Sequence, residues 1–557
     1  MSHTNTKRQV MWNRLLAVVE EQGQALIRAA FSPIVRECGD ISAGIFDFQG
    51  RMLAQAVTGT PGHINTMAEA VKTLRARFPI QEVQPGDIYM TNDPWIASGH
   101  LNDFLLMMPV FYRGRVIGFT ACTSHLVDLG GLGMGPEGAD IYDEGLLIPP
   151  CKLVSAGEVN VLLMQIVKAN SREPVANEGD IYALIACCEA GAASLGQMMA
   201  EFGISDLDAL SDFIIETSRL GTIAAIAELP KGTWHSRLTV DGYDQEIDLC
   251  AALTIADDHL TVDFSGTAPC TNKGINVPLN YATAYTVFAL RCIIGADIPN
   301  NAGSLAPFRV VAPTGCILNA QAPAPVAMRH TLGQMTPDLV YGCLSQALPE
   351  AVPAEGASCM YDLPLRHTPE AVDRNGAQFA IELVFSGGTG ARPALDGLSA
   401  TAFPSGVWGS QVETTEAAAP VLIHRRELRE GSGGAGKYRG GLGQIIEIGS
   451  AIKEDMLLFL SVERVGNAAK GRHGGLPGAT GRIRMGQGHA DLPSKGEFRI
   501  KAADRLIFET PGGGGFGPPE AREVSALRAD LTDGLLDADT AAAIYPAQMR
   551  TIEGENP

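Results

Sequence analysis

The feature that most constrains the fold is a pair of apolar, β-prone runs separated by one turn. The runs cover residues 104–111 and 116–123, and the turn between them reads Tyr-Arg-Gly-Arg. Glycine readily adopts the left-handed backbone conformation that tight turns need, and a short turn between two such runs joins antiparallel strands. The pattern therefore predicts a β-hairpin whose two ends lie together.

The length of the turn sets which residues face each other across the hairpin. A two-residue turn at 113–114 places Asp103 opposite Ser124 and His125 opposite Asn102. A register two residues away is also compatible with the apolar pattern. The prediction therefore concerns the meeting of the two ends rather than each individual pair.

Three residues at the meeting ends of the hairpin can bind a metal. His100 lies one loop turn before Asp103, and His125 follows the second run, so two imidazoles and one carboxylate can converge. Imidazole nitrogen and carboxylate oxygen suit zinc or manganese, with iron as a further option, whereas calcium and magnesium prefer oxygen ligands alone. A divalent metal with an open position lowers the pKa of its bound water, which is hydrolase chemistry. The alternative is that both histidines are ordinary polar loop residues.

A fourth ligand is expected just before the strand that begins at residue 41. Asp40 is the preferred candidate because it stands at the entrance to that strand, and Glu37 is the alternative. His63 and Asp128 are candidates for supporting the ligands or for contacting substrate. Each of these two is as readily explained as a surface residue.

Elsewhere the chain alternates between helical and strand-like patterns. Apolar residues recur at helical spacing over 10–30, 63–77, 280–294 and 332–348, more weakly over 180–228, and short apolar runs mark strands at 41–47, 51–55, 236–240 and 260–264. Residues 355–510 are rich in glycine and short apolar runs, which favours β structure, and 521–550 is acidic and helical. We expect a mixed α/β (α+β) fold, with a metal-bearing N-terminal α/β domain and a β-rich C-terminal region.

A chain of 557 residues exceeds what one hydrophobic core usually supports, so several domains are expected. The changes of pattern along the chain predict their bounds. These are a metal-site domain at 1–230, a central α/β domain at 231–350, a β-rich, glycine-rich domain at 351–520 and a helical tail at 521–557.

Composition and charge exclude several classes of partner and compartment. The formal net charge is −20, so the chain offers no basic patch for nucleic acid or for an anionic membrane surface. It has no apolar leader and no run of about 20 apolar residues, which predicts a cytoplasmic protein without a membrane span. The 11 cysteines include no C-x-x-C pair, so neither disulfides nor cysteine-held zinc is expected. Cys122, close to the candidate site, is most simply a buried thiol.

Some glycine-rich segments imitate ligand-binding motifs without meeting their requirements. Residues 431–437 satisfy G-x-x-x-x-G-K, but Tyr438 stands where a P-loop has the Ser or Thr that binds magnesium. The glycine run 512–515 can form either a nest of backbone N–H groups for an anion or a tight turn. The sequence contains no G-x-S-x-G elbow and no G-x-G-x-x-G loop opening a clear βαβ unit, so a serine hydrolase and a dinucleotide enzyme are unsupported.

Five ordered segments resemble the hydantoinase B/oxoprolinase family. They are TNDPWIASGHLNDF (91–104), TSHLVDLGG (123–131), DIYDEGLLIPP (140–150), ELREGSGGAGKYRGGLG (427–443) and TPGGGGFGPP (510–519). The resemblance extends from about residue 10 to about residue 520. The family includes subunits of N-methylhydantoinase, caprolactamase and acetone or acetophenone carboxylases, and the C-terminal half of 5-oxoprolinase.

The resemblance implies a metal held by an aspartate, an H-x-x-D element and an S-H element, which correspond here to Asp40, His100, Asp103 and His125. It also implies a hetero-oligomer with a hydantoinase A-like subunit that uses ATP and magnesium to phosphorylate the amide or enol oxygen of a small substrate. The expected function is hydrolysis of a cyclic amide, such as a hydantoin, oxoproline or a lactam. The alternatives are a ketone carboxylase subunit and a non-catalytic scaffold subunit.

One segment departs from the family pattern. Residues 324–338, APVAMRHTLGQMTPD, carry Arg329 and His330 where the family has a small, glycine-rich sequence. This difference indicates either another substrate or different packing. In the expected site, His63 and Arg329 contact the substrate, and Asp128 or Glu144 carries protons.

Overall fold

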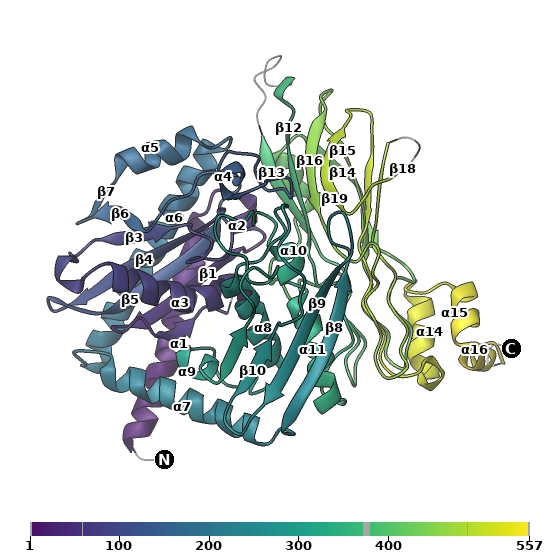
Figure 1. The fold of residues 1–557 in the computed structure, drawn as a ribbon, viewed down its shortest axis with the longest axis horizontal. Helices are drawn as coiled ribbons and strands as arrows, with labels where there is room; N and C mark the ends of the chain where they lie inside the picture. The colour runs from purple at the N-terminus through teal and green to yellow at the C-terminus, as the bar shows by residue number, and fades with distance from the viewer. Residues whose placement is uncertain (1–2, 58, 371–378, 487, 489, 555–557) are drawn as a thin grey trace.

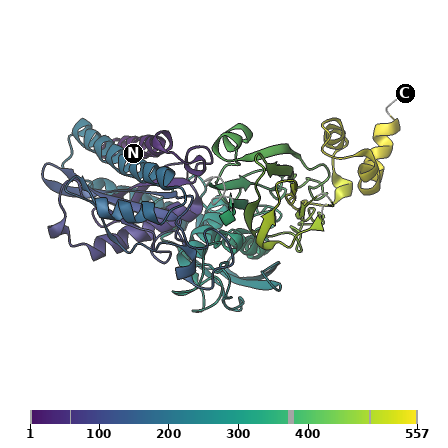
Figure 2. The same cartoon turned by 90° about the horizontal axis from the view of Figure 1, so that it is seen from above.

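The computed structural model describes the chain apart from residues 1–2, 58, 371–378, 487, 489 and 555–557. It confirms the mixed α/β fold, with helices around a large sheet in the N-terminal half and a C-terminal half dominated by strands. Figure 1 shows these halves next to each other, purple to blue and green to yellow, with teal segments between them. Seen from above in Figure 2, the C-terminal helices lie at the end of the molecule farthest from the N-terminal half.

The N-terminal sheet is antiparallel and has the strand order β2-β1-β5-β4-β3-β6-β7. Its strands are β1 (Ile41–Asp47), β2 (Met52–Gln55), β3 (Ile88–Thr91), β4 (Asp103–Tyr112), β5 (Arg115–His125), β6 (Cys151–Ser155) and β7 (Glu158–Val159). Phe104 and Leu106 pack with apolar residues of α1 (His3–Ala29) and α6 (Pro174–Phe202). Leu105 and Met107 pack on the other face, against α3 (Pro61–Arg77). The hairpin of β4 and β5 therefore lies between two helical layers.

The predicted hairpin is present, but the expected pairing was wrong by one residue. Next to the turn the register is the expected one, whereas a β-bulge at Ile117 shifts it from Val110 onward, so that Asp103 lies opposite His125 instead of Ser124. Directly opposed residues of antiparallel strands project from the same face of a sheet, and a shift by one residue reverses the face. The bulge therefore puts Asp103 and His125 on one face, which the unbulged register would not have done.

Helix α6 is long and apolar enough, by length and composition, to cross a membrane, and 50% of its most apolar window is buried. It packs along α1 and against β4 and β5. A helix that packs inside a protein core is apolar on most of its surface. The apolar composition of α6 is therefore explained by its packing in this fold.

The central segment forms a sheet with the order β11-β10-β9-β8. Its strands are β8 (Gly232–Val240), β9 (Ile247–Ile255), β10 (Leu260–Asp263) and β11 (Phe308–Val311), with β10 and β11 parallel. Helices α8 (Leu279–Ile293) and α11 (Thr336–Ala347) pack on each other, and α8 also packs on α3. The contact between α3 and α8 joins the central segment to the N-terminal sheet.

The strands of the C-terminal half form a β-sandwich. One sheet has the order β13-β12-β16-β19 and the other β14-β15-β20-β17-β18, and Leu363, Leu383, Ile446 and Phe508 are buried between them. The strands are β12 (Tyr361–His367), β13 (Ala380–Phe385), β14 (Val421–Leu428), β15 (Gln444–Ser450), β16 (Met456–Ser461), β17 (Arg482–Met485), β18 (Ala490–Asp491), β19 (Lys495–Ile500) and β20 (Leu506–Glu509).

The glycine run 512–515 forms neither an anion nest nor a tight turn. Its N–H groups donate to the carbonyl groups of Ala479, Gly441, Glu355 and Leu476, in that order. These partners belong to other segments of the C-terminal half, which run past the glycines at backbone contact. A Cβ on Gly513 would lie 1.9 Å from the carbonyl oxygen of Thr389, so this packing requires glycine. The run is therefore a structural element whose donors are used within the protein.

Shorter elements complete the fold. They are α2 (Pro33–Arg36), η1 (Ile80–Glu82), α4 (Ile141–Glu144), α5 (Val161–Ala169), α7 (Asp208–Ala227), α9 (Ala302–Leu305), α10 (His330–Gly333), α13 (Val412–Ala418) and η2 (Pro519–Ala521). The tail is helical, as expected, and consists of α14 (Val524–Thr532), α15 (Ala538–Ile544) and α16 (Pro546–Gly554). Arg522 anchors it by ion pairs with Asp396 and Asp530.

Candidate metal centre

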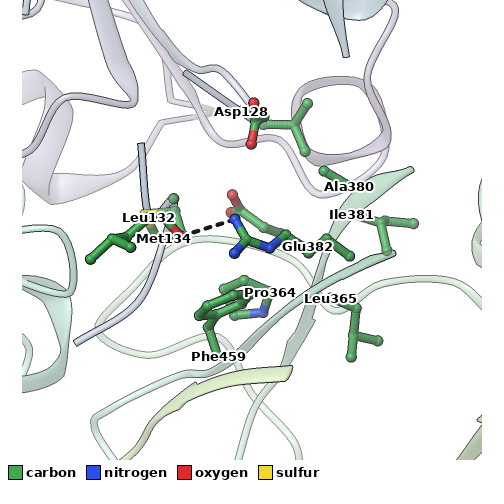
Figure 3. Close-up of a pocket in the computed structure, with 12 residues that line it drawn as sticks. Asp128, Leu132, Met134, Pro364, Leu365, Ala380, Ile381, Glu382 and Phe459 are labelled. Carbon is green, nitrogen blue, oxygen red and sulfur yellow. Dashed lines mark hydrogen bonds between the residues drawn. The ribbon is translucent and has the colours of Figure 1, made fainter. Parts of the chain in front are cut away.

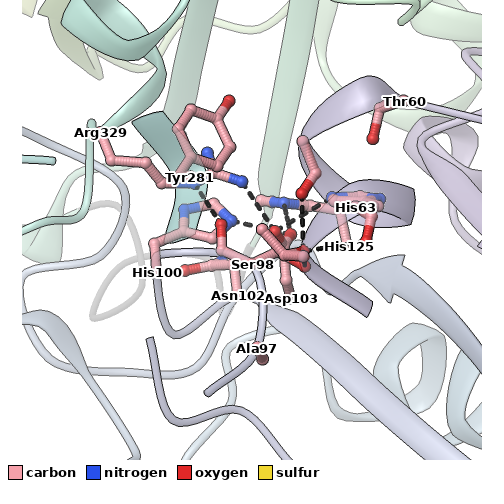
Figure 4. A network of polar contacts seen from close by, with 12 residues as sticks. Thr60, His63, Ala97, Ser98, His100, Asn102, Asp103, His125, Tyr281 and Arg329 are labelled. Atoms are coloured by element: carbon pink, nitrogen blue, oxygen red, sulfur yellow. Dashed lines mark hydrogen bonds and ion pairs between the residues drawn. The ribbon is translucent and has the colours of Figure 1, made fainter. Parts of the chain in front are cut away.

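Asp103 stands at the centre of a buried polar cluster (Figure 4). Its Oδ1 lies 2.8 Å from Nε2 of His100 and 3.2 Å from Nδ1 of His125. Its Oδ2 lies 3.0 Å from Nε2 of His63 and 2.7 Å from Nη2 of Arg329. The structure thus brings together four of the residues predicted for the site around the fifth, Asp103.

The local fold explains why these side chains converge. Asp103 begins β4 and His125 ends β5 on the face that α3 covers, and His63 lies in the first turn of α3. The N–H of His125 donates to the carbonyl group of Asp40, which places that aspartate beside it at the start of β1. Cys122 lies on the opposite face of β5, where its thiol is 3.5 Å from that of Cys188 on α6. Cys122 is therefore a buried core thiol and takes no part in the cluster.

The outer ring nitrogens of the two hairpin histidines are held by acceptors. Nδ1 of His100 lies 3.0 Å from the carbonyl oxygen of Ala327, and Nε2 of His125 lies 3.0 Å from Oε2 of Glu382. Both nitrogens of each ring therefore face an acceptor, and a neutral ring has only one hydrogen to donate. Where the outer nitrogen keeps that hydrogen, the inner nitrogen directs a lone pair at Asp103, and a proton or a metal ion must lie between them.

Charge and burial act differently on the two hairpin histidines. Burial, helped by the charge of Arg329, lowers the pKa of His100 to about 3, so this imidazole is neutral. Burial acts to raise the pKa of Asp103, but His100, His63 and Arg329 hold it well below its usual range. Burial by itself would lower the pKa of His125. The carboxylates of Glu382 and Asp103 outweigh burial and raise this pKa well above its usual value. A neutral His100 beside an ionised Asp103 lacks a cation at their contact.

The donor set fits a divalent metal. One ligand atom from each of His100, Asp103 and His125 lies within 4.8 Å of the others. Oδ2 of Asp40 is 4.0 Å from Nδ1 of His125, and its buried Oδ1 has no hydrogen-bond partner in the described part of the chain. Glu37 instead pairs with Arg36 at 2.8 Å. Two nitrogen and two oxygen donors suit zinc, manganese or iron.

A small pocket adjoins this cluster. The free space in it is about enough for one water molecule. It is lined by Asp40, Thr60, His63, Tyr281, Tyr285, Arg329, Gln334, Met360 and Val407. Arg329 lies 4.2 Å from the centroid of the Tyr281 ring, and its Nε donates to the carbonyl oxygen of Ser98. The segment that departs from the family pattern therefore lines this pocket. His63 and Arg329 both line it.

The two residues predicted to carry protons contact other groups. Asp128 accepts two hydrogen bonds from Arg172 and lines a different pocket, together with Glu382 (Figure 3). Oε1 of Glu144 accepts the N–H groups of Val326 and Ala327 at 2.6 and 2.8 Å. Both side chains therefore bind other parts of the chain.

Other buried residues also surround the candidate metal cluster. Glu382 and Asp362, on β13 and β12, are buried beside His125, and Tyr281 lies on α8. His330 is fully buried, and neither ring nitrogen has a hydrogen-bond partner among the described residues. Their contacts depend on packing between segments far apart in the chain. An isolated acidic residue within an apolar strand, as at Glu382 and Asp362, was an available signal.

Replacing Glu144 by glutamine is expected to make stability less dependent on pH. Burial raises the pKa of Glu144 from 4.5 to about 8, so the folded protein keeps a proton that the unfolded chain releases. Between these two values the free energy of unfolding of the wild type therefore falls as pH rises, and it levels off above them. Glutamine resembles the protonated carboxyl group and removes this decline.

The measurement is chemical unfolding of the wild type and the Glu144→Gln variant from pH 5 to pH 9. We expect the free energy of unfolding of Glu144→Gln to increase relative to that of the wild type as pH rises across this range. Glu497→Gln, at an exposed position of β19, is the control and should follow the wild type. Parallel curves for the wild type and Glu144→Gln would contradict the prediction.

Comparisons with known proteins give the family and the fold of this chain. A family model described as hydantoinase B/oxoprolinase matches residues 5–519. Caprolactamase subunit beta of Pseudomonas jessenii is 28% identical over 550 residues, which cover 94% of this chain and 93% of that protein. The crystal structure of ATP-dependent caprolactamase from Pseudomonas jessenii superposes with a TM-score of 0.89 at 26% identity, over 98% of this chain and 99% of that one. A nucleotide-free acetone carboxylase structure shares the fold, with a TM-score of 0.83 at 21% identity over 96% of this chain and 79% of that one.

Proposed function

This chain belongs to the hydantoinase B/oxoprolinase family, and from that premise we propose that it is the metal-carrying subunit of an ATP-dependent hydrolase of cyclic amides. It acts on a substrate that a separate hydantoinase A-like subunit phosphorylates with ATP and magnesium. The observation that carries the proposal is the buried cluster in which His100 and His125 present ring nitrogens to one oxygen of Asp103.

The chemistry explains why two components are needed. Amide resonance makes unstrained lactams and imides slow to hydrolyse, and phosphorylation of the amide oxygen gives the carbon a good leaving group. When bound, a divalent metal supplies a Lewis acid and lowers the pKa of water. Asp40, His100, Asp103 and His125 would hold it, because their donors are buried together and matched to its charge.

The residues of the adjoining pocket orient the substrate in this proposal. Arg329 points a fixed guanidinium at Asp103 and borders the pocket, so it can donate to an oxygen of the bound molecule. His63 reaches both Asp40 and Asp103 from the pocket wall. The proton-carrying role of Asp128 and Glu144 stays a prediction, since their bonds to Arg172 and to the backbone support a positioning role as well.

A ketone carboxylase subunit is the second candidate function. It is favoured by the fold shared with acetone carboxylase. The same ligand set can serve either reaction, because both begin from a substrate whose oxygen has been phosphorylated. The two functions differ in the second reactant, which is water in one and a carboxyl donor in the other.

The test is co-expression of this chain with a hydantoinase A-like subunit. We expect the purified complex to contain close to one divalent metal per copy of this chain, measured by plasma mass spectrometry. With ATP it should open the ring of at least one of hydantoin, 5-oxoproline and caprolactam, with phosphate released in step with product. Fixation of labelled bicarbonate onto a ketone would instead support the carboxylase. A metal-free complex that opens rings at full rate would overturn the proposal.

A further inference from the structure

Glu382 is a buried carboxylate that touches one candidate metal ligand from outside the cluster. Its Oε1 and Oε2 lie 3.1 and 3.0 Å from Nε2 of His125, the nitrogen that points away from Asp103. The side chains of Glu382 and His125 are 4% and 3% exposed, so solvent does little to replace this contact. They are 257 positions apart in the chain, which makes the bond a tie between two parts of the fold.

The position of Glu382 on its strand explains how it reaches the N-terminal half. Its neighbours on β13, Ile381 and Leu383, are buried in the core of the β-sandwich. Side chains alternate along a strand, so Glu382 points out of the sandwich, on the face that it shares with Asp362 of β12. That face packs against the end of the N-terminal hairpin, and Val384 of the same face joins the hairpin's apolar cluster.

Imidazole has two nearly equivalent nitrogens, and the bond made by one decides the role of the other. If Nε2 of His125 donates its hydrogen to Glu382, Nδ1 is left as a lone pair directed at the cluster. Without that acceptor the ring can carry its hydrogen on Nδ1 or rotate about its bonds, and either change removes a metal ligand. His100 is held in the same way by the backbone carbonyl group of Ala327, which no substitution removes.

We propose that Glu382 is the positioning residue that keeps Nδ1 of His125 directed at the metal, so that metal retention depends on the packing of the β-sandwich against the N-terminal hairpin. The inference rests on the proposed function, because it takes the Asp103 cluster as a metal site. It goes further by assigning a role to a residue of the distant sandwich. Outer carboxylate partners of this kind typically change metal affinity by about 10- to 100-fold.

A matched control lies on the same strand. Glu173, which precedes α6, accepts the N–H of Ala380 at 2.9 Å, two residues before Glu382. It therefore also ties the N-terminal half to β13, but it binds a backbone N–H group rather than a histidine. Loss of this bond tests whether weakening the interface alone affects the metal.

The experiment measures zinc affinity of the purified full chain by competition with a chromophoric chelator, without ATP or substrate. We expect Glu382→Ala to weaken zinc binding by about 10- to 100-fold and Glu382→Gln, whose amide oxygen still accepts from Nε2, by a smaller factor. Glu173→Ala, which removes the bond to Ala380, should bind zinc as the wild type does. Wild-type affinity in both Glu382 variants, or equal losses in Glu173→Ala, would overturn the inference.

A spectroscopic measurement separates positioning from general loosening of the fold. Cobalt(II) in place of zinc gives visible absorption bands that report the number and kind of ligands. We expect Glu382→Ala to change these bands and Glu382→Gln to restore most of the wild-type spectrum. If the alanine variant fails to fold, Glu382→Met decides, because methionine fills similar space without an oxygen that accepts from Nε2, and wild-type affinity and spectrum in it would overturn the inference. A wild type that binds zinc but opens no ring contradicts the proposed hydrolase and leaves the role of Glu382 standing.

Discussion

Replacing His100 by alanine is expected to remove the metal from the assembled enzyme and to lower ATP-dependent ring opening by about a thousandfold or more, equivalent to at least about 4 kcal/mol of transition-state stabilisation. His100 is buried, its pKa is lowered to about 3, and Nε2 faces Asp103 at 2.8 Å. Alanine leaves that carboxylate without one of its nitrogen neighbours and leaves the metal without one of its ligands. A Lewis acid bound by fewer ligands is retained poorly.

The measurement combines metal content with turnover in the complex with the ATP-binding subunit. His367→Ala is the control, because His367 is a partly buried histidine whose Nδ1 contacts the backbone of Phe379 rather than a carboxylate. This variant should keep both metal and activity. If His100→Ala and His125→Ala complexes retained full activity, the chain would be a scaffold for its partner and the hydrolase proposal would fail.

The Arg329→Ala variant is expected to lose about 3–5 kcal/mol of unfolding free energy when measured without metal. Arg329 is 4% exposed, and its guanidinium bonds to Asp103 and to the carbonyl oxygen of Ser98 while it stacks on Tyr281. Alanine removes these contacts together and leaves Asp103 buried with less compensation. Removing one partner of a buried ion pair costs more than the pair itself contributes, because the remaining charge stays out of water.

Urea unfolding of the wild type, Arg329→Ala and Arg329→Lys tests this prediction, with metal and with a chelator. Lysine keeps the charge but not the planar fork, so we expect it to recover part of the loss. Added metal should reduce the loss in Arg329→Ala, because the ion also neutralises Asp103. An Arg329→Ala midpoint close to that of the wild type, with an unchanged dependence on urea, would show that the guanidinium contributes little to stability.

The sequence determined the elements that carry the metal centre. Two apolar, β-prone runs and the turn at Arg113-Gly114 predict the hairpin, and short-range spacing brings His100 to Asp103. The helical spacing of apolar residues predicts helix α3, which carries His63. These features depend on neighbours in the chain or on one turn, so local physics is sufficient to predict them.

Tertiary structure decided what completes the centre. The bulge at Ile117 depends on how β5 fits between its neighbours, and without it Asp103 and His125 would lie on opposite faces of the sheet. Glu382 reads in the sequence as an exposed residue of a strand, because a period of two identifies the outward face but not what covers it. The β-sandwich is packed against the hairpin by apolar contacts between segments hundreds of residues apart, and that packing turns an outward carboxylate into a buried partner of His125.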